Sequence, residues 1–337
     1  MSSPYMTPNA AKKSVPAYTT SAVIPTRNRP ELVCRAIESV LRQTSADIEI
    51  VVVIDGPDTV TARALERFAY SPHLRVEHLP ESVGGGEARN IGVRSARGCW
   101  IAFLDDDDEW LDTKVQIQLQ LALESESHDV VVLSNYVVRR SGARDMVRPR
   151  RMPRRAEPLS EYLFKPGCGF QTSVFFASRS LLLRIPFTRG LRKHQDWDWL
   201  LRVAADPDVT LRMSDQALAI WYDLSTPDRV SSSSDWEFTL LWLRNNAHLF
   251  TRVAYSAFVA KVCLPAAVAQ GQDWRTLWRL GRIFLFEGRP SIGSALLFVT
   301  KCILPRQLIY KWRDPLIAAV VRPARGQTTD ASGLTSA

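Results

Sequence analysis

Residues 100–111 have the sequence WIAFLDDDDEWL, an apolar run that ends abruptly in four aspartates and a glutamate. Packing five acids this closely costs electrostatic energy, because like charges a few ångströms apart repel each other. An apolar run of this kind predicts a buried strand. Acids clustered directly after a buried strand suggest a site that uses their negative charge.

The segments around this stretch alternate between two hydrophobic periods. Helical spacing occurs in residues 31–43, 61–70, 84–96 and 113–125, and apolar or β-branched runs occupy residues 21–25, 48–54, 74–78, 99–104 and 129–138. The run IEIVVVI (48–54) is apolar at nearly every position, as in a strand of a parallel sheet that is buried on both faces. The alternation predicts right-handed βαβ units and an α/β fold with a doubly wound sheet.

The pattern changes after about residue 139. Residues 139–158 are rich in arginine and proline and predict a loop, residues 170–178 predict a strand, and the second half of residues 193–206 predicts a helix. From about Asp235 onward the pattern is entirely helical. We therefore expect a disordered lead at 1–19, an α/β domain at 20–225, a helical region at 235–315 and a disordered tail at 322–337.

The composition is that of a globular protein with a basic charge balance. The chain has 337 residues, 46% of them hydrophobic, and a formal net charge of +8, which indicates an anionic partner or surface without identifying it. The five cysteines are odd in number and far apart, with no CxxC pair. They predict neither a zinc site nor a disulfide framework and fit a reducing, intracellular setting.

Targeting and membrane signals are weak in this sequence. The first 20 residues lack the apolar core of a signal peptide. A membrane span needs about 18 to 20 uninterrupted apolar residues. The nearest candidate, IGSALLFVTKCIL (292–304), is shorter and contains Lys301, so we expect no spanning segment.

Three polar loops directly follow predicted strands: PTRNRP (25–30), DGPD (55–58) and DDDDEW (105–110). In an open α/β sheet, ligands bind outside the carboxyl ends of the strands, so these loops predict a shared site. Magnesium in proteins takes one or two carboxylates and completes its coordination with phosphate oxygens and water, which suits this cluster with Asp107 on the metal. The alternative is a solvated acidic turn that caps the next helix.

The stretch ESVGGGEARN (81–90) matches neither the GxGxxG fingerprint nor a P-loop. Glycines ahead of a helix still allow a ligand to approach the backbone closely, and a helix N-terminus favours a phosphate group. Arg89, one turn into the predicted helix, would add positive charge. The alternative is a tight turn whose glycines adopt positive φ.

In this order and spacing, the stretches SAVIPTRNRPELVCRAIESVLRQT, IEIVVVIDGP and GGGEARNIGVRSARGCWIAFLDDDDEW resemble glycosyltransferase family 2. The resemblance covers about residues 20–125 strongly and reaches to about 222 more loosely. It implies an inverting enzyme with the GT-A fold, a Rossmann-like nucleotide-diphosphosugar transferase fold with a mostly parallel sheet. The C-terminal helical region matches no general feature of the family.

The resemblance also implies roles for individual residues. The predicted contacts to the nucleotide sugar are Pro25, Thr26, Arg27, Asn28, Asp55, Arg89, Asp105 and Asp106. Asp105 and Asp107 match the first and last positions of the family's DxD motif, so Asp107 is the predicted contact to Mn²⁺ or Mg²⁺. The segment QDWDWLLR (195–202) resembles the later Glu-Asp motif, which makes Asp196 the predicted catalytic base.

The sequence departs from the family's pattern at three positions. Ile54 replaces an acid before Asp55, and Arg27 replaces a common tyrosine, so the preferred nucleotide stays open. Gln195 replaces the glutamate before Asp196, so Asp198 is an alternative base.

The chemistry of sugar transfer fits these roles. A metal stabilises the charge on the leaving diphosphate, and a carboxylate removes the proton of a carbohydrate or lipid-linked acceptor. Trp197 or Trp199 is a candidate for stacking on a sugar, although large aromatic residues usually belong to the core. His194 is more simply a structural hydrogen-bonding residue.

The basic segments suggest a second kind of contact. RPRRMPRR (148–155) carries five arginines, and DWRTLWRLGRIFLF (273–286) alternates aromatic and aliphatic residues with arginine. Such segments suit the anionic inner face of the plasma membrane, or equally a helical subdomain with arginines in solvent. We therefore predict a cytoplasmic protein, with peripheral membrane attachment as one option.

Two other functions are alternatives. A sugar nucleotidyltransferase shares the nucleotide-binding architecture but usually has a glycine-rich loop after its first strand, and PTRNRP has no glycine. A nucleic-acid-binding protein would use the arginine run, but it leaves the acids at three strand ends unexplained, since acids repel phosphate backbones. We expect no nucleic-acid partner.

Overall fold

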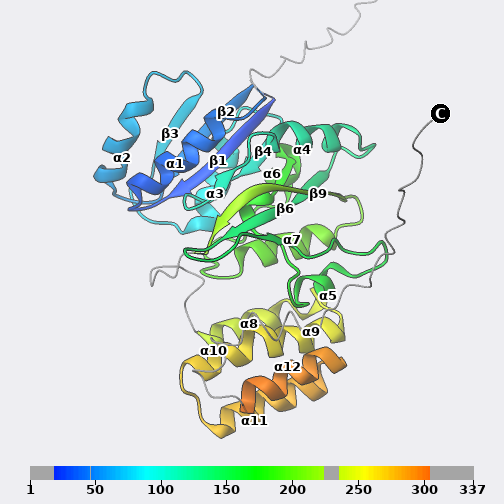
Figure 1. Cartoon of the computed structure of the whole chain (residues 1–337). Coiled ribbons are helices and arrows are strands. Elements are labelled where there is room, and N and C mark those ends of the chain that lie inside the picture. Colours follow the sequence, from blue (N-terminus) through cyan, green and yellow to red (C-terminus); the bar gives the residue numbers. More distant parts are fainter. Residues whose placement is uncertain (1–18, 46, 224–234, 304–337) are drawn as a thin grey trace, which may run out of the picture.

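The computed structural model describes residues 19–45, 47–223 and 235–303. One continuous sheet, curled and flanked by helices, forms the N-terminal part, and a bundle of helices lies against one end of it (Figure 1). The strands run in the order β3-β2-β1-β4-β8-β6-β9-β5, with β7 paired to β6. The predicted α/β class with a C-terminal helical region is therefore confirmed.

The first half of the sheet is parallel. Its strands are β1 (Thr20–Thr26), β2 (Ile48–Ile54), β3 (Leu74–His78) and β4 (Trp100–Phe103). The helices between them are α1 (Pro30–Leu41), α2 (Thr59–Leu65) and α3 (Gly85–Ser95). β2 is buried along its whole length between β1 and β3, as its apolar sequence predicts.

The second half of the sheet is mixed. It contains β5 (Glu109–Trp110), β6 (Val130–Arg139), β7 (Met146–Arg148), β8 (Phe176–Ser178) and β9 (Thr210–Tyr222). β8 runs antiparallel to β4 and β6, whereas β6 and β9 are parallel. The parallel pairing that we predicted therefore covers β1 to β4 and the β6–β9 pair.

Two predictions in this half were wrong in detail. Residues 170–178 do not form one strand, because Thr172–Val174 is a 3-10 turn and only Phe176–Ser178 is extended. The arginine-rich stretch 139–158 is not wholly a loop, because β7 pairs with β6 there. The helices in this part of the chain are α4 (Lys114–Leu123), α7 (Gln195–Ala204) and the shorter α5 (Leu159–Leu163) and α6 (Arg179–Arg184).

Gly92 allows α3 to lie directly on the sheet. A Cβ at this position would collide with the side chain of Val23 on β1 and would lie 3.3 Å from that of Val53 on β2. The glycine therefore sets how closely α3, which follows the glycine-rich loop, approaches the strands that end in the predicted site.

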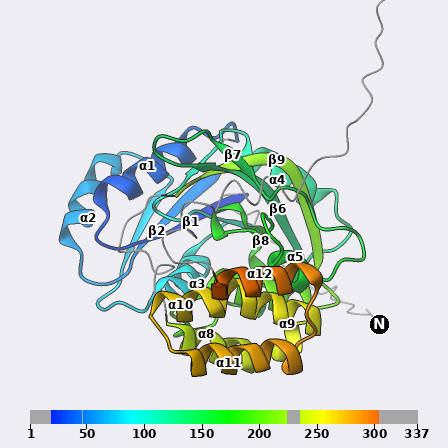
Figure 2. The same ribbon diagram turned by 60° about the horizontal axis from the view of Figure 1, so that its bottom comes forward.

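The residues after the sheet fold as a bundle. Its helices are α8 (Trp236–Asn245), α9 (Arg252–Phe258), α10 (Leu264–Ala269), α11 (Trp274–Arg282) and α12 (Ile292–Ile303). Figure 2 shows them grouped on one side of the sheet. The helical prediction from Asp235 onward holds through Ile303. The predicted lead to residue 18, the boundary at 225, residues 304–315 and the tail lie outside the described residues.

The run Arg252–Ala269 is long and apolar enough to cross a membrane, by length and composition alone. We expected no such segment and took residues 292–304 as the nearest candidate. The mean hydropathy of the run Arg252–Ala269 is 1.4, and half of it is buried against the rest of the protein. The core helix of a soluble protein meets the same criteria, and α9 and α10 form the centre of the bundle.

Candidate active site

The loops after β1 and β4 meet at the carboxyl ends of the strands, as predicted. Asp106 links them, because its carboxylate accepts a hydrogen bond from Thr26 Oγ1 at 2.8 Å and another from Arg29 Nη1 at 2.9 Å. Pro25 and Thr26 form the end of β1. The sequence prediction that the first loop and the acidic loop share a site is therefore consistent with the geometry.

The four aspartates alternate between inward and outward positions. The side chains of Asp105 and Asp107 are 28% and 17% exposed, whereas that of Asp106 is 8% exposed. Asp108 is fully buried and accepts a hydrogen bond from Ser173 Oγ at 2.5 Å. Asp105 and Asp107 are thus the more exposed pair at the carboxyl ends of the strands, which we call the mouth of the sheet, and the other two aspartates anchor the loop.

Burial changes the ionisation of the inward-facing pair. Desolvation raises the pKa of Asp106 to about 6, with Arg29 opposing the shift and Asp107 adding to it. Burial and the charges of Asp107 and Asp105 raise the pKa of Asp108 well above its ordinary value. The ion pair between Arg29 and Asp106 offsets part of the repulsion that the sequence implied.

Two arginines that we did not predict support Asp107. Arg29 Nη1 lies 3.4 Å from its carboxylate, and Arg35 Nη2 donates to its backbone carbonyl at 2.7 Å. Both arginines come from the segment RNRPELVCR, which leads from the first loop into α1. Arg29 and Arg35 lie four and ten residues after Pro25, and this spacing fits no sequence pattern that would have identified them as contacts of the acidic loop.

Asp55 orders the loop ahead of α3. Its carboxylate accepts hydrogen bonds from the backbone amides of Val83 at 2.6 Å and Gly84 at 3.0 Å, and from Ser82 Oγ at 3.0 Å. Gly84 has a φ of +85°, so the positive-φ interpretation holds for this glycine. Asp55 therefore connects the end of β2 with the start of α3.

Arg27 and Asn28 occupy the outer part of the first loop. Both are exposed, and Arg27 Nη1 donates to Ser82 Oγ at 2.9 Å, which extends the network around Asp55. Asn28 has a φ of +54°, and its amide donates to Asp58 Oδ2 at 2.5 Å. These contacts place the first loop beside the second one.

Arg89 connects the acidic loop with α7. Its side chain is 10% exposed and forms an ion pair with Asp105, while its Nη1 donates to Gln195 Oε1 at 2.9 Å. Gln195 lies 106 positions further along the chain and begins α7. This contact brings Asp196, the next residue, to the mouth of the sheet.

Asp196 is partly buried in the first turn of α7. Desolvation raises its pKa to about 6, with a further increase from the charge of Asp105. The backbone amide of Trp197 and the charge of Arg89 oppose that shift. Asp196 therefore combines a position near Asp105 with a pKa suited to proton transfer near neutral pH.

Asp198, the alternative base, is committed to packing. It is 3% exposed and accepts hydrogen bonds from Thr188 Oγ1 at 2.6 Å and Trp242 Nε1 at 3.1 Å. Arg202, one turn later, forms an ion pair with it at 2.9 Å. Asp198 thus fastens α7 to α8 of the bundle, and the geometry favours Asp196 as the base.

The aromatic residues of this motif are structural. Trp199 is fully buried and donates through Nε1 to Ile185 O at 2.8 Å. Trp197 stacks on His194, with ring centroids 5.1 Å apart. Burial lowers the pKa of His194 to about 3, so it stays neutral and bonds Thr239 Oγ1 at 3.1 Å.

The described residues contain no group of three or more His, Cys, Asp or Glu side chains arranged to hold a metal ion. Asp105 and Asp107 nevertheless present oxygen donors at the mouth. Magnesium needs only one or two carboxylates when phosphate oxygens and water complete its coordination. The donor set therefore fits a hard divalent cation that binds together with a diphosphate.

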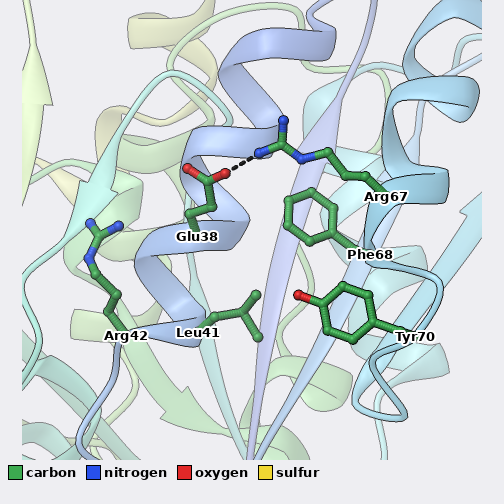
Figure 3. A pocket seen from close by; sticks show the side chains of 6 residues that line it. All are labelled: Glu38, Leu41, Arg42, Arg67, Phe68 and Tyr70. Atoms are coloured by element: carbon green, nitrogen blue, oxygen red, sulfur yellow. Dashed lines mark hydrogen bonds and ion pairs between the residues drawn. The ribbon is translucent and has the colours of Figure 1, made fainter.

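Two pockets on the described surface lie away from the predicted site residues. Figure 3 shows one of about 440 Å³ that is lined by the C-terminal half of α1 together with Arg67, Phe68 and Tyr70. Arg42, which follows α1 and lines this pocket, forms an ion pair with Glu109 of β5 at 3.2 Å. None of the predicted site residues lines this pocket.

Comparison with known families and proteins identifies a matching family model. The family model described as Glycosyl transferase family 2 matches residues 21–193, just over half of the chain. This range contains every predicted donor-binding residue but stops three residues before Asp196.

Three curated relatives are similar along part of the chain. The amylovoran biosynthesis glycosyltransferase AmsB of Erwinia amylovora is 28% identical over 70% of this chain and 80% of its own length. The succinoglycan biosynthesis protein ExoO of Rhizobium meliloti is 30% identical over 52% of each chain. The putative colanic acid biosynthesis glycosyl transferase WcaA of Escherichia coli is 28% identical over 57% of this chain and 65% of its own.

Solved structures share the fold at low sequence identity. S. aureus TarS in complex with UDP-GlcNAc has a TM-score of 0.56 at 16% identity, covering 88% of this chain and 92% of that one. The mannosyltransferase PcManGT of Pyrobaculum calidifontis, in complex with GDP-Man and Mn²⁺, has a TM-score of 0.50 at 13% identity, covering 90% and 81%. The predicted GT-A fold is confirmed by this likeness.

Proposed function

This chain belongs to glycosyl transferase family 2, and we propose that it moves a sugar from a nucleotide diphosphate to a hydroxyl group with inversion at the anomeric carbon. One observation carries the proposal. Arg89 contacts both Asp105 and Gln195, which brings the acidic loop and the first turn of α7 to one place. The candidate donor site and the candidate base therefore lie side by side at the carboxyl ends of the strands.

The donor would bind across the three loops. Asp55 and the first loop, Pro25 to Asn28, would hold the nucleoside, and Arg89 and Asp105 would position the ribose and diphosphate. Asp106, which we predicted as a further donor contact, instead holds the loop through Thr26 and Arg29. Arg27 and Ser82 border Asp55, so their side chains would influence which base is accepted. The start of α3 adds backbone amides that favour a phosphate.

Asp107 would hold Mn²⁺ or Mg²⁺, with Asp105 beside it. The bound ion would stabilise the charge that develops on the leaving diphosphate. Arg29 and Arg35 keep Asp107 in place through its carboxylate and its backbone carbonyl. The Mn²⁺ in the PcManGT complex supports divalent metal use by a protein of this fold.

Asp196 would act as the general base. Its carboxylate would take the proton from the acceptor hydroxyl while the acceptor oxygen forms a bond to the anomeric carbon. The bond from that carbon to the diphosphate oxygen breaks in the same displacement, so the configuration inverts. A pKa near 6 leaves Asp196 mostly ionised at neutral pH and more basic than an ordinary aspartate.

The acceptor would be a carbohydrate or a lipid-linked sugar. The similar proteins AmsB, ExoO and WcaA are named for the biosynthesis of amylovoran, succinoglycan and colanic acid. These are names of relatives that match only part of this chain. They support a role in polysaccharide synthesis, and the five free cysteines fit the reducing cytoplasm.

A panel of uridine, guanosine, adenosine and thymidine diphosphate sugars tests the proposal. With Mn²⁺ and no acceptor, water takes the acceptor's place, and we expect slow release of the nucleoside diphosphate from one nucleotide class. The release should stop when the metal is chelated. Failure of every donor to bind or to react would contradict the proposal.

A further inference from the structure

The outer helices of the bundle carry large apolar side chains on their surface. Figure 1 shows α11 and α12 at the end of the bundle farthest from the sheet. On α12, four residues spaced at i, i+4, i+7 and i+11 are 84%, 62%, 51% and 72% exposed: Ile292, Leu296, Val299 and Ile303. This spacing forms one stripe along the solvent side of the helix.

α11 and the residues after it add a second exposed apolar row. Trp274 and Trp278 are 70% and 60% exposed, and Leu285 and Phe286 are 56% and 71% exposed. The helices that carry the two rows are in contact, because Phe284, which follows α11, and Phe298 of α12 stack with their ring centroids 4.6 Å apart. Exposed apolar side chains on this scale usually indicate an interaction surface.

The charge around these rows is mostly positive. Residues 273–303 contain four arginines and one lysine against two acids, Asp273 and Glu287, both exposed. Glu287 binds Arg244 and Tyr255, which leaves the surface with a positive balance. Within the described residues, no ion pair is found for Arg275, Arg279, Arg282 or Arg289. Arg282 instead lies over the ring of Trp278, at 5.0 Å from its centroid.

We propose that this surface, which we call the α11–α12 face, binds the surface of an anionic lipid bilayer. Tryptophan suits the boundary between water and acyl chains, the aliphatic stripe suits the acyl chains, and arginine suits anionic headgroups. The pattern is that of a helix that lies in the interface rather than one that spans the bilayer. The proposal does not depend on the sugar or the acceptor.

Two other occupants fit the charge less well. A second copy of the chain would bring the same arginines together, and like charges repel at an interface. Residues 304–337 carry five basic and two acidic residues, so this segment repeats the positive charge of the face. Anionic lipid supplies both the apolar phase and the opposite charge.

Cosedimentation of the full chain with vesicles tests the proposal. We expect binding to phosphatidylcholine vesicles that contain phosphatidylglycerol, weaker binding to phosphatidylcholine alone, and loss of binding as salt rises. The double variant Ile292→Glu, Leu296→Glu should lower binding at least about tenfold, since it removes two apolar contacts. Each of Arg275→Gln and Arg279→Gln should lower it about fivefold.

Leu123→Glu is the matched control, because Leu123 is 68% exposed on α4, outside this face. It should leave vesicle binding unchanged. Thermal unfolding and donor hydrolysis without vesicles should be the same in all variants, which separates this surface from the active site. The proposal is overturned if the wild-type chain ignores anionic vesicles, if Leu123→Glu weakens binding as much as the double variant, or if the double variant dissociates a dimer.

Discussion

The mouth of the sheet and the α11–α12 face both carry arginine, but they place its charge in opposite surroundings. In the mouth, Arg29 is partly buried and paired with Asp106, and Arg89 is largely buried and paired with Asp105. On the α11–α12 face, Arg275, Arg279 and Arg282 are exposed, and within the described residues none of them forms an ion pair, although the charges of Arg275 and Arg279 lower the pKa values of Asp273 and Glu287. Paired charges hold loops in position for a ligand, whereas exposed unpaired charges are available to a partner.

The same contrast recurs within α7. Asp196 has a raised pKa and lies near the charged mouth. Asp198, two residues later, accepts hydrogen bonds from Thr188, from Trp242 of α8 and from Arg202 one turn further along α7. One carboxylate is therefore placed for chemistry and the other for packing. The predictions below test this difference between sites of function and sites of structure.

The largest effect is expected at Asp196. Asp196→Asn should lower donor hydrolysis about a thousandfold, the range for loss of a general base, while the donor Kd changes less than about threefold. Initial rates and calorimetric titration with the same donor measure the two effects. Normal turnover by the variant would show that another group is the base.

Asp198→Ala should act on stability instead. It leaves the Trp242 indole and the Arg202 guanidinium without their buried partner, which costs about 3 kcal/mol of unfolding free energy. Urea denaturation of both variants measures this difference. If Asp198→Ala unfolds like the wild type but loses activity, then the roles assigned to the two carboxylates are reversed.

Gly92 and Gly293 compare packing in the two regions. Gly92→Ala should destabilise the protein by about 2 kcal/mol, because the added methyl group collides with Val23. Gly293→Ala, in α12, meets no atom within 4 Å and should stabilise by less than about 1 kcal/mol. Equal shifts in the unfolding midpoint would contradict the close packing of α3 on the sheet.

The pH profile should show the smallest effect. Asp196 must be ionised to accept a proton, so kcat/KM for donor hydrolysis should be level above its pKa of about 6. Below that pH it should fall about tenfold per pH unit. Asp106 also has a pKa of about 6, so Asp106→Asn is the control that should keep the same limb. A flat profile down to pH 5 would exclude Asp196 as the base.

The sign of the linked stability follows from the same shifts. Both pKa values lie above the value of about 4 for an aspartate in an unfolded chain. The folded protein therefore binds more protons between pH 4 and 6, and the unfolding free energy decreases as pH rises through that window.

The parallel half of the fold could be predicted from local pattern. IEIVVVI gave the bounds of β2, Ile48–Ile54, without error, because burial on both faces leaves an apolar run. β9 was not predicted, since its first half, TLRMSDQ, is mostly polar and its main partner, β6, starts 80 residues earlier. Long-range pairing of this kind leaves no periodic signal in the sequence.

The grouping of the three loops was predictable, but the contacts within the group were not. Strand ends indicated the loops; the first meets the acidic loop through Thr26 and Asp106 and meets the second loop through Asn28 and Asp58. The inward and outward alternation of the aspartates depends on Arg29 and Ser173, and the choice between Asp196 and Asp198 depends on Trp242 from the bundle. These contacts join segments far apart in the chain.

Calorimetric titration of the donor found by the nucleotide-sugar panel, with and without Mn²⁺, tests the central claim most directly. The account predicts binding that requires the metal, that is lost in Asp107→Ala and that persists in Asp112→Ala, whose side chain is 61% exposed beside the same loop. Equal donor affinity in wild type and Asp107→Ala, with or without Mn²⁺, would contradict it.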